Sequence, residues 1–157
     1  MQRKSVKPHS RRSRLRSESG QALVEFALVL PVLVLAMMMV LEFGKVFNYW
    51  QDEAHLANQA ARLAAVDQNP GGGTLQQYIQ AQADAPELKN GGTDSVASPA
   101  KVCITPGSAV GDPVKATVTI SYKWLPILGG VASTNISGSA TMRMERPASH
   151  YSSGCSS

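Results

Sequence analysis

The sequence is poor in the residues that build metal sites and disulfide scaffolds. It has two cysteines, Cys103 and Cys155, and three scattered histidines that form no ligand pair. Two cysteines are too few for a disulfide-rich scaffold and lack the spacing of a zinc site. The sequence also contains no nucleophile–base pair, phosphate-binding loop or paired carboxylates in a plausible pocket. We therefore expect no metal, no cofactor and no enzymatic activity.

Basic charge is scarce outside the first 20 residues. That segment holds seven of the fifteen Lys and Arg residues and one acidic residue, so its net charge is +6, whereas the remaining chain has −2. A nucleic-acid-binding domain would carry its basic residues along a folded face, so we expect no nucleic-acid partner. Residues 1–19 are polar and serine-rich, which predicts disorder because they cannot bury enough surface to offset the entropy of ordering.

Charge is also nearly absent from the run that follows. From Ala22 to Leu41 the only charged residue is Glu25. A membrane-spanning helix needs roughly 20 apolar residues, and residues 21–44 reach that length. The positive-inside rule then places residues 1–20 in the cytoplasm and the C-terminal part outside. A cleaved secretory signal fits less well, because its apolar region is about 7–15 residues long and ends at a small-residue site.

The helical pattern continues beyond the apolar run. Residues 45–66 contain no Pro or Gly and place apolar residues at helical spacing, so one rod over 21–66, about 69 Å long, is predicted. Phe47, Tyr49 and Trp50 are typical of an aromatic belt at the membrane interface. The turn-forming residues 69–73 end the rod. Pro31 either loosens the membrane helix or is simply tolerated there.

The remaining chain predicts a small sheet. Thr74 is a candidate N-cap for a short helix over 75–83, and residues 89–99 read as a loop. Residues 114–123 and 136–144 alternate apolar and polar side chains, as half-buried strands do, and 102–105 is a shorter third strand. The predicted fold is α+β: a long N-terminal transmembrane helix continues into an extracytoplasmic helix that packs on a small antiparallel sheet within residues 45–147.

Two segments of this part stay open or unstructured in the prediction. The connector between the two long strands contains Trp124, Leu125, Ile127 and Leu128. These side chains fill the core, touch the membrane or form a subunit contact, and the sequence does not decide among the three. Residues 148–157 read as a flexible tail. A disulfide between Cys103 and Cys155 would tie this tail to the first strand, and an extracytoplasmic location permits it.

The most informative motif lies where the basic segment ends, and it reads Gly20-Gln21-Ala22-Leu23-Val24-Glu25-Phe26. A basic leader that ends in glycine, with a glutamate five residues later inside an apolar helix, resembles a type IV prepilin processing site. The longer stretch GQALVEFALVLPVLVL, with LEFGKVF and QAARLAAV downstream, resembles the TadE-like family of tight-adherence (Tad) pilus proteins. The strands near the C-terminus are similar to that family's pattern as well.

The resemblance implies a function and a set of partners. It implies a bacterial minor pilin or pseudopilin that a prepilin peptidase cuts after Gly20, exposing Gln21 as the new N-terminus. Glu25 and Phe26 would then act in assembly with other pilin-like subunits and the Tad secretion platform, first in the lipid of the cytoplasmic membrane and then in an extracellular pilus. Major-pilin relatives are shorter and carry Glu-Tyr where this chain has Glu25-Phe26, which favours a minor subunit over the main one.

Other readings of the same residues remain open. In the alternative without a functional role, Glu25 is simply a glutamate at the membrane interface, and Gly20 is a flexible joint between the basic segment and the helix. An uncleaved, membrane-anchored scaffold or binding protein of the secretion or pilus machinery is the second hypothesis. A secreted enzyme or adhesin tethered by its signal is the third, and the weak polar chemistry of residues 74–146 argues against its enzymatic form.

Overall fold

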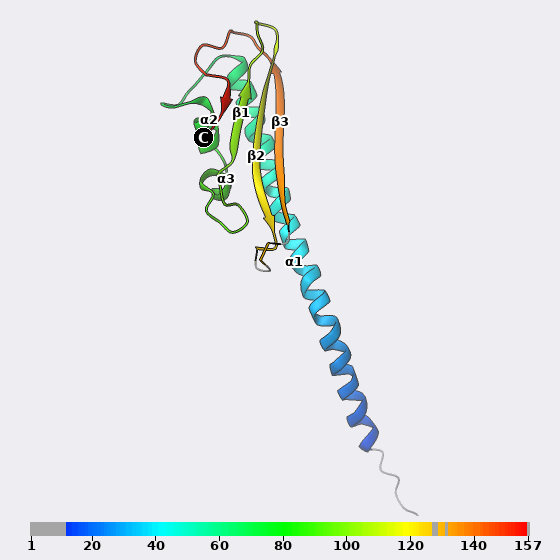
Figure 1. Ribbon diagram of the computed structural model, residues 1–157. Helices are drawn as coiled ribbons and strands as arrows, with labels where there is room; N and C mark the ends of the chain where they lie inside the picture. The colour runs from blue at the N-terminus through cyan, green and yellow to red at the C-terminus, as the bar shows by residue number, and fades with distance from the viewer. Residues whose placement is uncertain (1–11, 127–128, 131, 157) are drawn as a thin grey trace, which may run out of the picture. The chain divides into compact units, whose positions relative to one another are not determined.

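The computed structural model describes residues 12–126, 129–130 and 132–156, with side chains from Gly20 onward. The chain divides into two compact units, residues 1–40 and 41–157. The first unit contains the apolar part of one long helix. The second contains the C-terminal part of that helix, two short helices and a four-stranded antiparallel sheet (Figure 1). This arrangement confirms the predicted α+β fold class.

The long helix α1 spans Arg12–Ala65 and includes Pro31. It ends one residue before the predicted boundary but begins eight residues before Gly20, inside the segment predicted to be disordered. Extending an existing helix costs far less than nucleating a new one, and no Pro or Gly occurs between Arg12 and Ser19. The first eleven residues of the predicted leader lie outside the described part of the chain.

Two short helices follow α1. The first, α2, spans Leu75–Ala81, and Thr74 caps it as predicted: its hydroxyl accepts a hydrogen bond from the Gln77 amide, while the Gln77 side chain accepts one from the Thr74 amide. Such a reciprocal capping box satisfies two amides that the helix leaves unpaired. The second, α3, spans Pro86–Asn90 and was not predicted. Proline is favoured in the first helical turn because its missing N–H has no partner there anyway.

The sheet has the strand order β3-β2-β1-β4 and is antiparallel throughout. Its strands are β1 (Lys101–Thr105), β2 (Pro113–Trp124), β3 (Ala132–Arg143) and β4 (Gly154–Cys155). The first three correspond to the predicted strands, and β3 starts four residues earlier than predicted. The alternating apolar residues of β2 are buried as the pattern indicated: Val114, Ala116, Val118, Ile120 and Tyr122.

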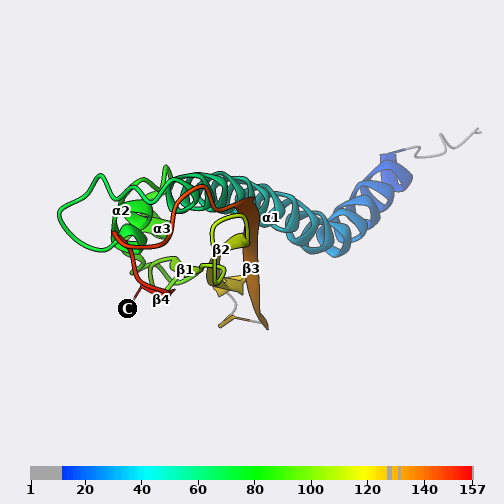
Figure 2. The ribbon, with the colours of Figure 1, turned by 90° about the horizontal axis from the view of Figure 1, so that it is seen from above.

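The C-terminal part of α1 packs on one face of this sheet, as the two views in Figures 1 and 2 show. The helix contributes Leu56 and small residues such as Ala57, Ala60 and Ala64 to the hydrophobic core. The two backbones approach closely at Gly138 of β3, where a Cβ atom would stand 2.5 Å from the Ala54 nitrogen. Small residues on both elements therefore let helix and strand backbones come into direct contact.

The C-terminal segment is packed against the same unit rather than loose, which differs from the predicted flexible tail. The Glu145 amide donates to the Ala65 carbonyl at the end of α1, and the Gln76 side chain donates to the Ser152 carbonyl. Tyr151 is buried in the core. Cys155 pairs with Cys103 in the β1–β4 ladder, and the two sulfurs form a disulfide. Strand β4 was not predicted, because a strand of two residues is too short to show an alternating pattern in the sequence.

Candidate functional site

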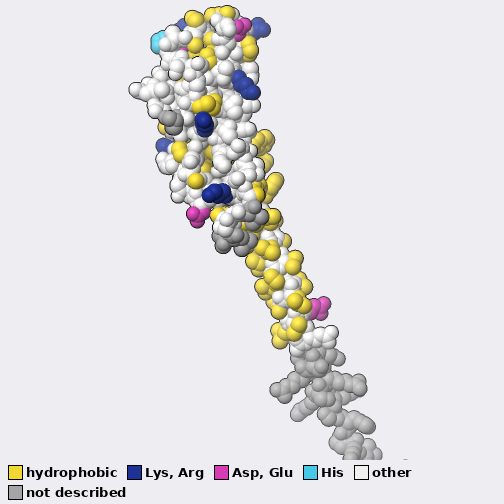
Figure 3. Space-filling view, viewed as in Figure 1, with side chains coloured by type: hydrophobic (Ala, Val, Ile, Leu, Met, Phe, Trp, Pro, Cys, Tyr) yellow, Lys and Arg dark blue, Asp and Glu magenta, His cyan; other side chains and the backbone are white. Residues whose placement is uncertain are grey.

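The first candidate site is the apolar surface of α1. Large side chains from Leu23 to Leu41 are mostly exposed, and hydrophobic side chains cover the visible face of this helix (Figure 3). A helix that is apolar on all sides belongs in a membrane or in a core. The described residues contain one helix long and apolar enough to cross a membrane, within Gly20–Ala65, and its apolar stretch is not buried. This is compatible with a single-pass membrane anchor.

Glu25 interrupts this apolar surface. It is the only charged residue between Gly20 and Leu41, and its side chain is exposed. Within the described part of the chain no group forms a hydrogen bond or an ion pair with it. Gln21 lies four residues earlier, one helical turn away on the same face. Among the residues whose side chains the structure describes, none compensates the charge of this carboxylate.

Gly20 and Phe26 flank this carboxylate on the same helix. A Cβ atom added at Gly20 would meet nothing within 4 Å. Glycine inside a helix costs roughly 0.5–1 kcal/mol relative to alanine, so packing within the described chain gives no reason for its presence. The Phe26 side chain is 59% exposed. The predicted processing and assembly residues therefore share one helical segment, and none of them contributes to the core of the folded unit.

A second polar group lies where α1 enters the folded unit. The Glu42 side chain is buried and accepts a hydrogen bond from the Tyr122 hydroxyl of β2, while Lys45 lies 3.5 Å from its other oxygen. Burial and the Glu42 carboxylate both raise the pKa of Tyr122. Glu42 belongs to the folded unit, where it supplies the hydrogen-bond partner that the inward-facing Tyr122 hydroxyl needs.

Tyr49 was assigned to an aromatic belt, and that assignment is wrong. Its side chain is buried against Tyr122, with ring centroids 5.9 Å apart. Phe47 and Trp50 are exposed, as a belt would require. In the connector between the two long strands, two of the four apolar side chains pack inside the folded unit: Leu125 is buried, and the Trp124 ring packs edge-on against Tyr122. Ile127 and Leu128 lie outside the described residues.

The end of α1 carries a third polar cluster around Asp67. This buried carboxylate accepts hydrogen bonds from the backbone amides of Ser149 and His150 and from the Ser149 hydroxyl, and it lies 2.7 Å from His150 Nδ1. Burial alone would raise the pKa of Asp67, but these four interactions outweigh it and hold the pKa well below its usual range. The cluster fastens the C-terminal segment to the end of α1.

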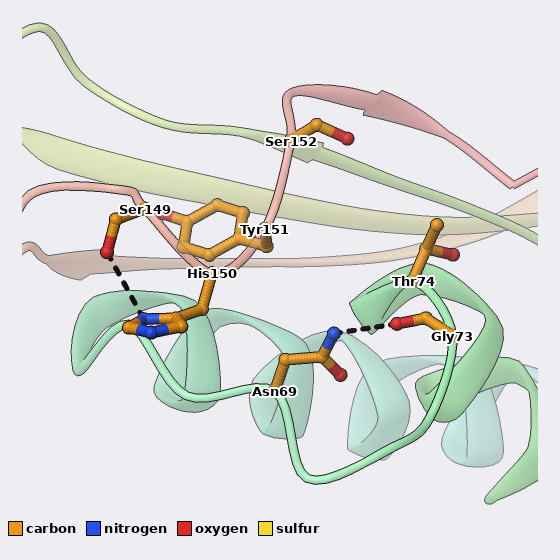
Figure 4. Close-up of a pocket in the computed structure, with 7 residues that line it drawn as sticks. All are labelled: Asn69, Gly73, Thr74, Ser149, His150, Tyr151 and Ser152. Atoms are coloured by element: carbon orange, nitrogen blue, oxygen red, sulfur yellow. Dashed lines mark hydrogen bonds between the residues drawn. The ribbon is translucent and has the colours of Figure 1, made fainter.

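The combination of Ser149, His150 and Asp67 is not arranged as a catalytic triad. In a triad the serine contacts one imidazole nitrogen and the aspartate contacts the other. Here the Ser149 hydroxyl lies 3.1 Å from Nδ1, the same nitrogen that faces Asp67. The imidazole therefore cannot pass a proton between the two. Figure 4 shows the open polar pocket beside this cluster, which Asn69 and Thr74 also line.

Two further observations bear on chemistry. Among the residues that the structure describes, no group of three His, Cys, Asp or Glu side chains is placed to hold a metal ion. Glu53 on α1 is fully buried, and neither of its carboxylate oxygens has a hydrogen-bond partner. Burial raises the pKa of Glu53 to about 8, so the side chain is largely protonated at neutral pH.

Three polar features of the folded unit were missed from the sequence: the hydrogen bond between Glu42 and Tyr122, the Asp67 cluster, and the burial of Glu53. The first could have been predicted. Tyr122 occupies a buried position of the alternating strand pattern, so its hydroxyl needs a hydrogen-bond partner, and Glu42 is an isolated acidic residue at the end of the apolar run. The other two join residues more than 60 positions apart with no shared motif. Nothing in a single sequence indicates such pairs.

Comparison with known proteins supports the resemblance that the motif indicated. Residues 20–62 match the family model described as TadE-like protein, which confirms the predicted family over the apolar helix and its continuation. The match ends within α1 and does not include the sheet. It associates the chain with the Tad pilus, whose TadE-like components are structural or assembly proteins. No curated protein and no solved structure matches the chain.

Proposed function

We propose that this TadE-like protein is a minor pilin or pseudopilin of the Tad pilus, processed after Gly20 and assembled through α1. The observation that carries the proposal is an exposed, TadE-like apolar helix that bears one carboxylate, Glu25, near its N-terminal end, with no pairing group among the described side chains. The chain is a substrate of a prepilin peptidase and not itself an enzyme. It inserts with the N-terminus in the cytoplasm, loses its basic leader, and then packs its apolar helix against other pilin-like subunits.

The surroundings of Gly20 support processing at this position. A peptidase needs close access to the backbone on both sides of the bond that it cuts, and glycine permits the closest approach. No described residue packs against the Gly20 position. Cutting there would remove seven of the fifteen Lys and Arg residues and leave Gln21 as the mature N-terminus. Gly20 is therefore explained by an external enzyme better than by the fold.

Cleavage would also create a partner for Glu25. The new α-amino group of Gln21 has an unperturbed pKa near 7.7–8.0 and is largely cationic at neutral pH. A charged residue at the centre of a membrane helix costs roughly 2.5–3.5 kcal/mol on insertion scales, and one near the cytoplasmic end, as Glu25 is, costs less because it can reach the headgroups. Pairing of Glu25 in one subunit with the Gln21 amine of a neighbour lowers that cost for both charges and fixes the axial register of the two helices, as buried polar pairs do in coiled coils.

The test is the variant Glu25→Ala in the organism's own pilus system. We expect normal membrane insertion and leader removal, because neither depends on the pairing, and a strong loss of the protein from the assembled pilus fraction. Immunoblots of membrane and sheared-pilus fractions measure both. Glu145→Ala is the matched control, since Glu145 is an exposed acid of the folded unit. Undiminished incorporation of Glu25→Ala would refute the pairing mechanism.

Variants of Gly20 separate this function from a permanent membrane anchor. A pilin-like subunit with Gly20→Leu retains its leader and fails to assemble. An uncleaved scaffold of the secretion or pilus machinery tolerates both Gly20→Leu and Glu25→Leu without loss of function. Piliation of a strain that carries each variant as its only copy decides between the two.

A further inference from the structure

The face of the sheet that points away from α1 carries positive charge and no negative charge. Successive strand residues point to opposite faces, so the positions between the buried residues of β1, β2 and β3 form this outer face. Its cations are Lys101, Lys115, Lys123 and Arg143, and all four are exposed. We call this surface the basic face. In Figure 3, which looks onto it, Lys and Arg side chains are spread over a mostly uncharged surface.

The other side chains of the basic face are mostly small and polar. Apart from the cations, Cys103 and Pro113, its positions on β1–β3 hold only hydroxyl and amide side chains: Thr105, Thr117, Thr119, Ser121, Ser133, Asn135, Ser137, Ser139 and Thr141. The strand register joins them into rows across the sheet, such as Lys101–Thr119–Ser137. A ligand on this face therefore meets hydrogen-bond donors and acceptors between the cations.

The fold itself does not use these charges. Among the residues that the structure describes, no carboxylate lies within ion-pair distance of the four cations. Opposite charges on neighbouring strands stabilise a sheet, but this face has no acidic residue to supply them. Lysines that keep a sheet from pairing with another chain belong on edge strands, whereas Lys115 and Lys123 lie on the interior strand β2. The charges are thus available to a ligand.

The cations are distributed along the strands. The register places Lys101 level with Thr119 and Arg143 level with Pro113. In order along the sheet the cations are therefore Arg143, Lys115, Lys101 and Lys123. The steps between them are about 7, 13 and 13 Å at 3.3 Å per residue, so the series is about 33 Å long. An extended polymer with spaced negative charges matches this layout, whereas a small anion would meet one cation at a time.

The composition of the basic face favours an acidic polysaccharide over other polyanions. Protein interfaces are rich in aromatic residues and poor in Lys and Ser, and single-stranded nucleic acids stack on aromatic rings. The basic face has no aromatic residue. Duplex DNA carries a charge every 1.7 Å or so, so four cations over about 33 Å leave most phosphates unpaired. Helices that lie on membranes add Trp, Phe or Leu, which this face also lacks.

We propose that the basic face binds an extended acidic polysaccharide, with carboxylate groups on its sugar rings. The cations pair with the carboxylates, and the Ser, Thr and Asn side chains form hydrogen bonds with the sugar hydroxyls. The inference goes beyond the assembly role proposed for α1, because it gives the folded unit a ligand of its own. The contacts are exposed to solvent, so added salt weakens the binding.

Lysine footprinting of the full chain in non-ionic detergent tests the proposal. The chain is treated with an amine-reactive reagent with and without polygalacturonate, and mass spectrometry gives the modification rate of each lysine. Lysines of the basic leader are thereby scored separately. At a polymer concentration about ten times the Kd, we expect modification of Lys101, Lys115 and Lys123 to slow about tenfold, because few sites remain free. Lys89, an exposed lysine of α3, should react at its original rate.

Two sets of variants separate the charges from the hydroxyl groups. Lys115→Gln combined with Lys123→Gln should raise the polymer concentration that protects Lys101 about five- to tenfold, as expected for two exposed ion pairs. Arg62→Gln combined with Lys89→Gln removes the same charge from exposed positions outside the basic face and is the matched control.

Thr119→Val removes a hydroxyl beside Lys101 and keeps a β-branched side chain that suits a strand. It should weaken protection of Lys101 without changing the charge of the chain. Retention of the Cys103–Cys155 disulfide verifies the fold of each variant.

Three further probes identify the ligand class. Methyl-esterified polygalacturonate keeps sugar hydroxyls but loses the charge, and we expect it to protect none of the three lysines. Duplex DNA and phosphatidylglycerol vesicles, used at equal charge concentration, should protect them less than polygalacturonate does. Equal or stronger protection by any of the three contradicts an acidic polysaccharide as the ligand.

Absence of protection by polygalacturonate, or equal protection of Lys89, overturns the proposal. The measurement uses the solubilised chain without the peptidase or any partner. Either failure therefore leaves leader processing and the Glu25 mechanism to their own tests.

Discussion

Glu53 is the residue whose environment differs most from that of an ordinary surface carboxylate. It lies on α1 directly under the backbone of Gly138 in β3, and it is fully buried with both oxygens unpaired. An ionised carboxylate in such a place lacks both water and hydrogen bonds. The protein avoids this cost by keeping the group protonated, which is why burial raises the pKa from 4.5 to about 8.

This environment makes stability depend on pH. Between pH 4.5 and about 8 the folded state holds a proton on Glu53 that the unfolded state has lost. The free energy of unfolding therefore falls as pH rises through this window and levels off above it. Glu53→Gln keeps the neutral shape, so the variant should unfold at higher urea concentration than the native chain at pH 8–9 and show a weaker dependence on pH.

Urea unfolding of the detergent-solubilised chain between pH 5 and 9 measures this difference. Glu145→Gln is the control, because Glu145 is exposed, and it should keep the native pH dependence. If Glu53→Gln and the native chain follow parallel curves, Glu53 is not the group responsible.

At the scale of elements, the contact between β3 and α1 decides how the sheet is held. A Cβ atom at Gly138 would lie 2.5 Å from both the Ala54 nitrogen and the Glu53 carbonyl carbon, and backbone atoms cannot turn aside as a flexible side chain can. Gly138→Ala should therefore push the strand from the helix and lower the free energy of unfolding by about 1–3 kcal/mol. Thermal or urea unfolding checks the size of this loss.

Gly44→Ala is the matched control for that variant. A Cβ atom there meets nothing within 4 Å, and the residue lies inside α1. Alanine favours a helix over glycine by about 1 kcal/mol, so this change should leave stability equal or slightly higher. Equal losses from the two substitutions would contradict the close packing at Gly138.

The C-terminal segment is the other element with a structural role. The Cys103–Cys155 disulfide closes a loop with a sequence separation of 52 residues, and Asp67 and Gln76 hold the same segment through hydrogen bonds. Cys103→Ser combined with Cys155→Ser should lower the free energy of unfolding by about 2–4 kcal/mol, mainly because the unfolded chain gains freedom. The native chain with its disulfide reduced should unfold at the same urea concentration as the double variant. If the double variant and the reduced chain both unfold at the urea midpoint of the disulfide-bonded native chain, the hydrogen bonds alone hold the segment.

At the scale of the whole molecule, the sequence predicted the parts that local patterns determine. The long helix followed from an apolar run and the absence of helix breakers, and β2 followed from strict alternation between Val114 and Tyr122. The cap at Thr74 followed from one residue. Each of these depends on neighbours within a few positions, which a single sequence displays.

The parts that were missed depend on distant contacts. The C-terminal segment has no periodicity and is ordered by Asp67, Gln76 and Cys103, all far away in sequence. Tyr49 was misassigned because a belt residue and a core residue look alike until β2 places Tyr122 against one of them. The motif at Gly20–Phe26 was recognised because its residues are adjacent in sequence, and the role that we propose for it depends on partners outside the chain.

The central claim is that the chain is a processed pilin-like subunit, and the mature N-terminus tests it most directly. Mass spectrometry of the protein extracted from membranes, with and without its prepilin peptidase, measures that end. The account predicts a start at Gln21 that requires the peptidase, with the full leader retained in its absence. An intact leader in both samples would contradict it, since the free amine on which the Glu25 pairing depends would never form.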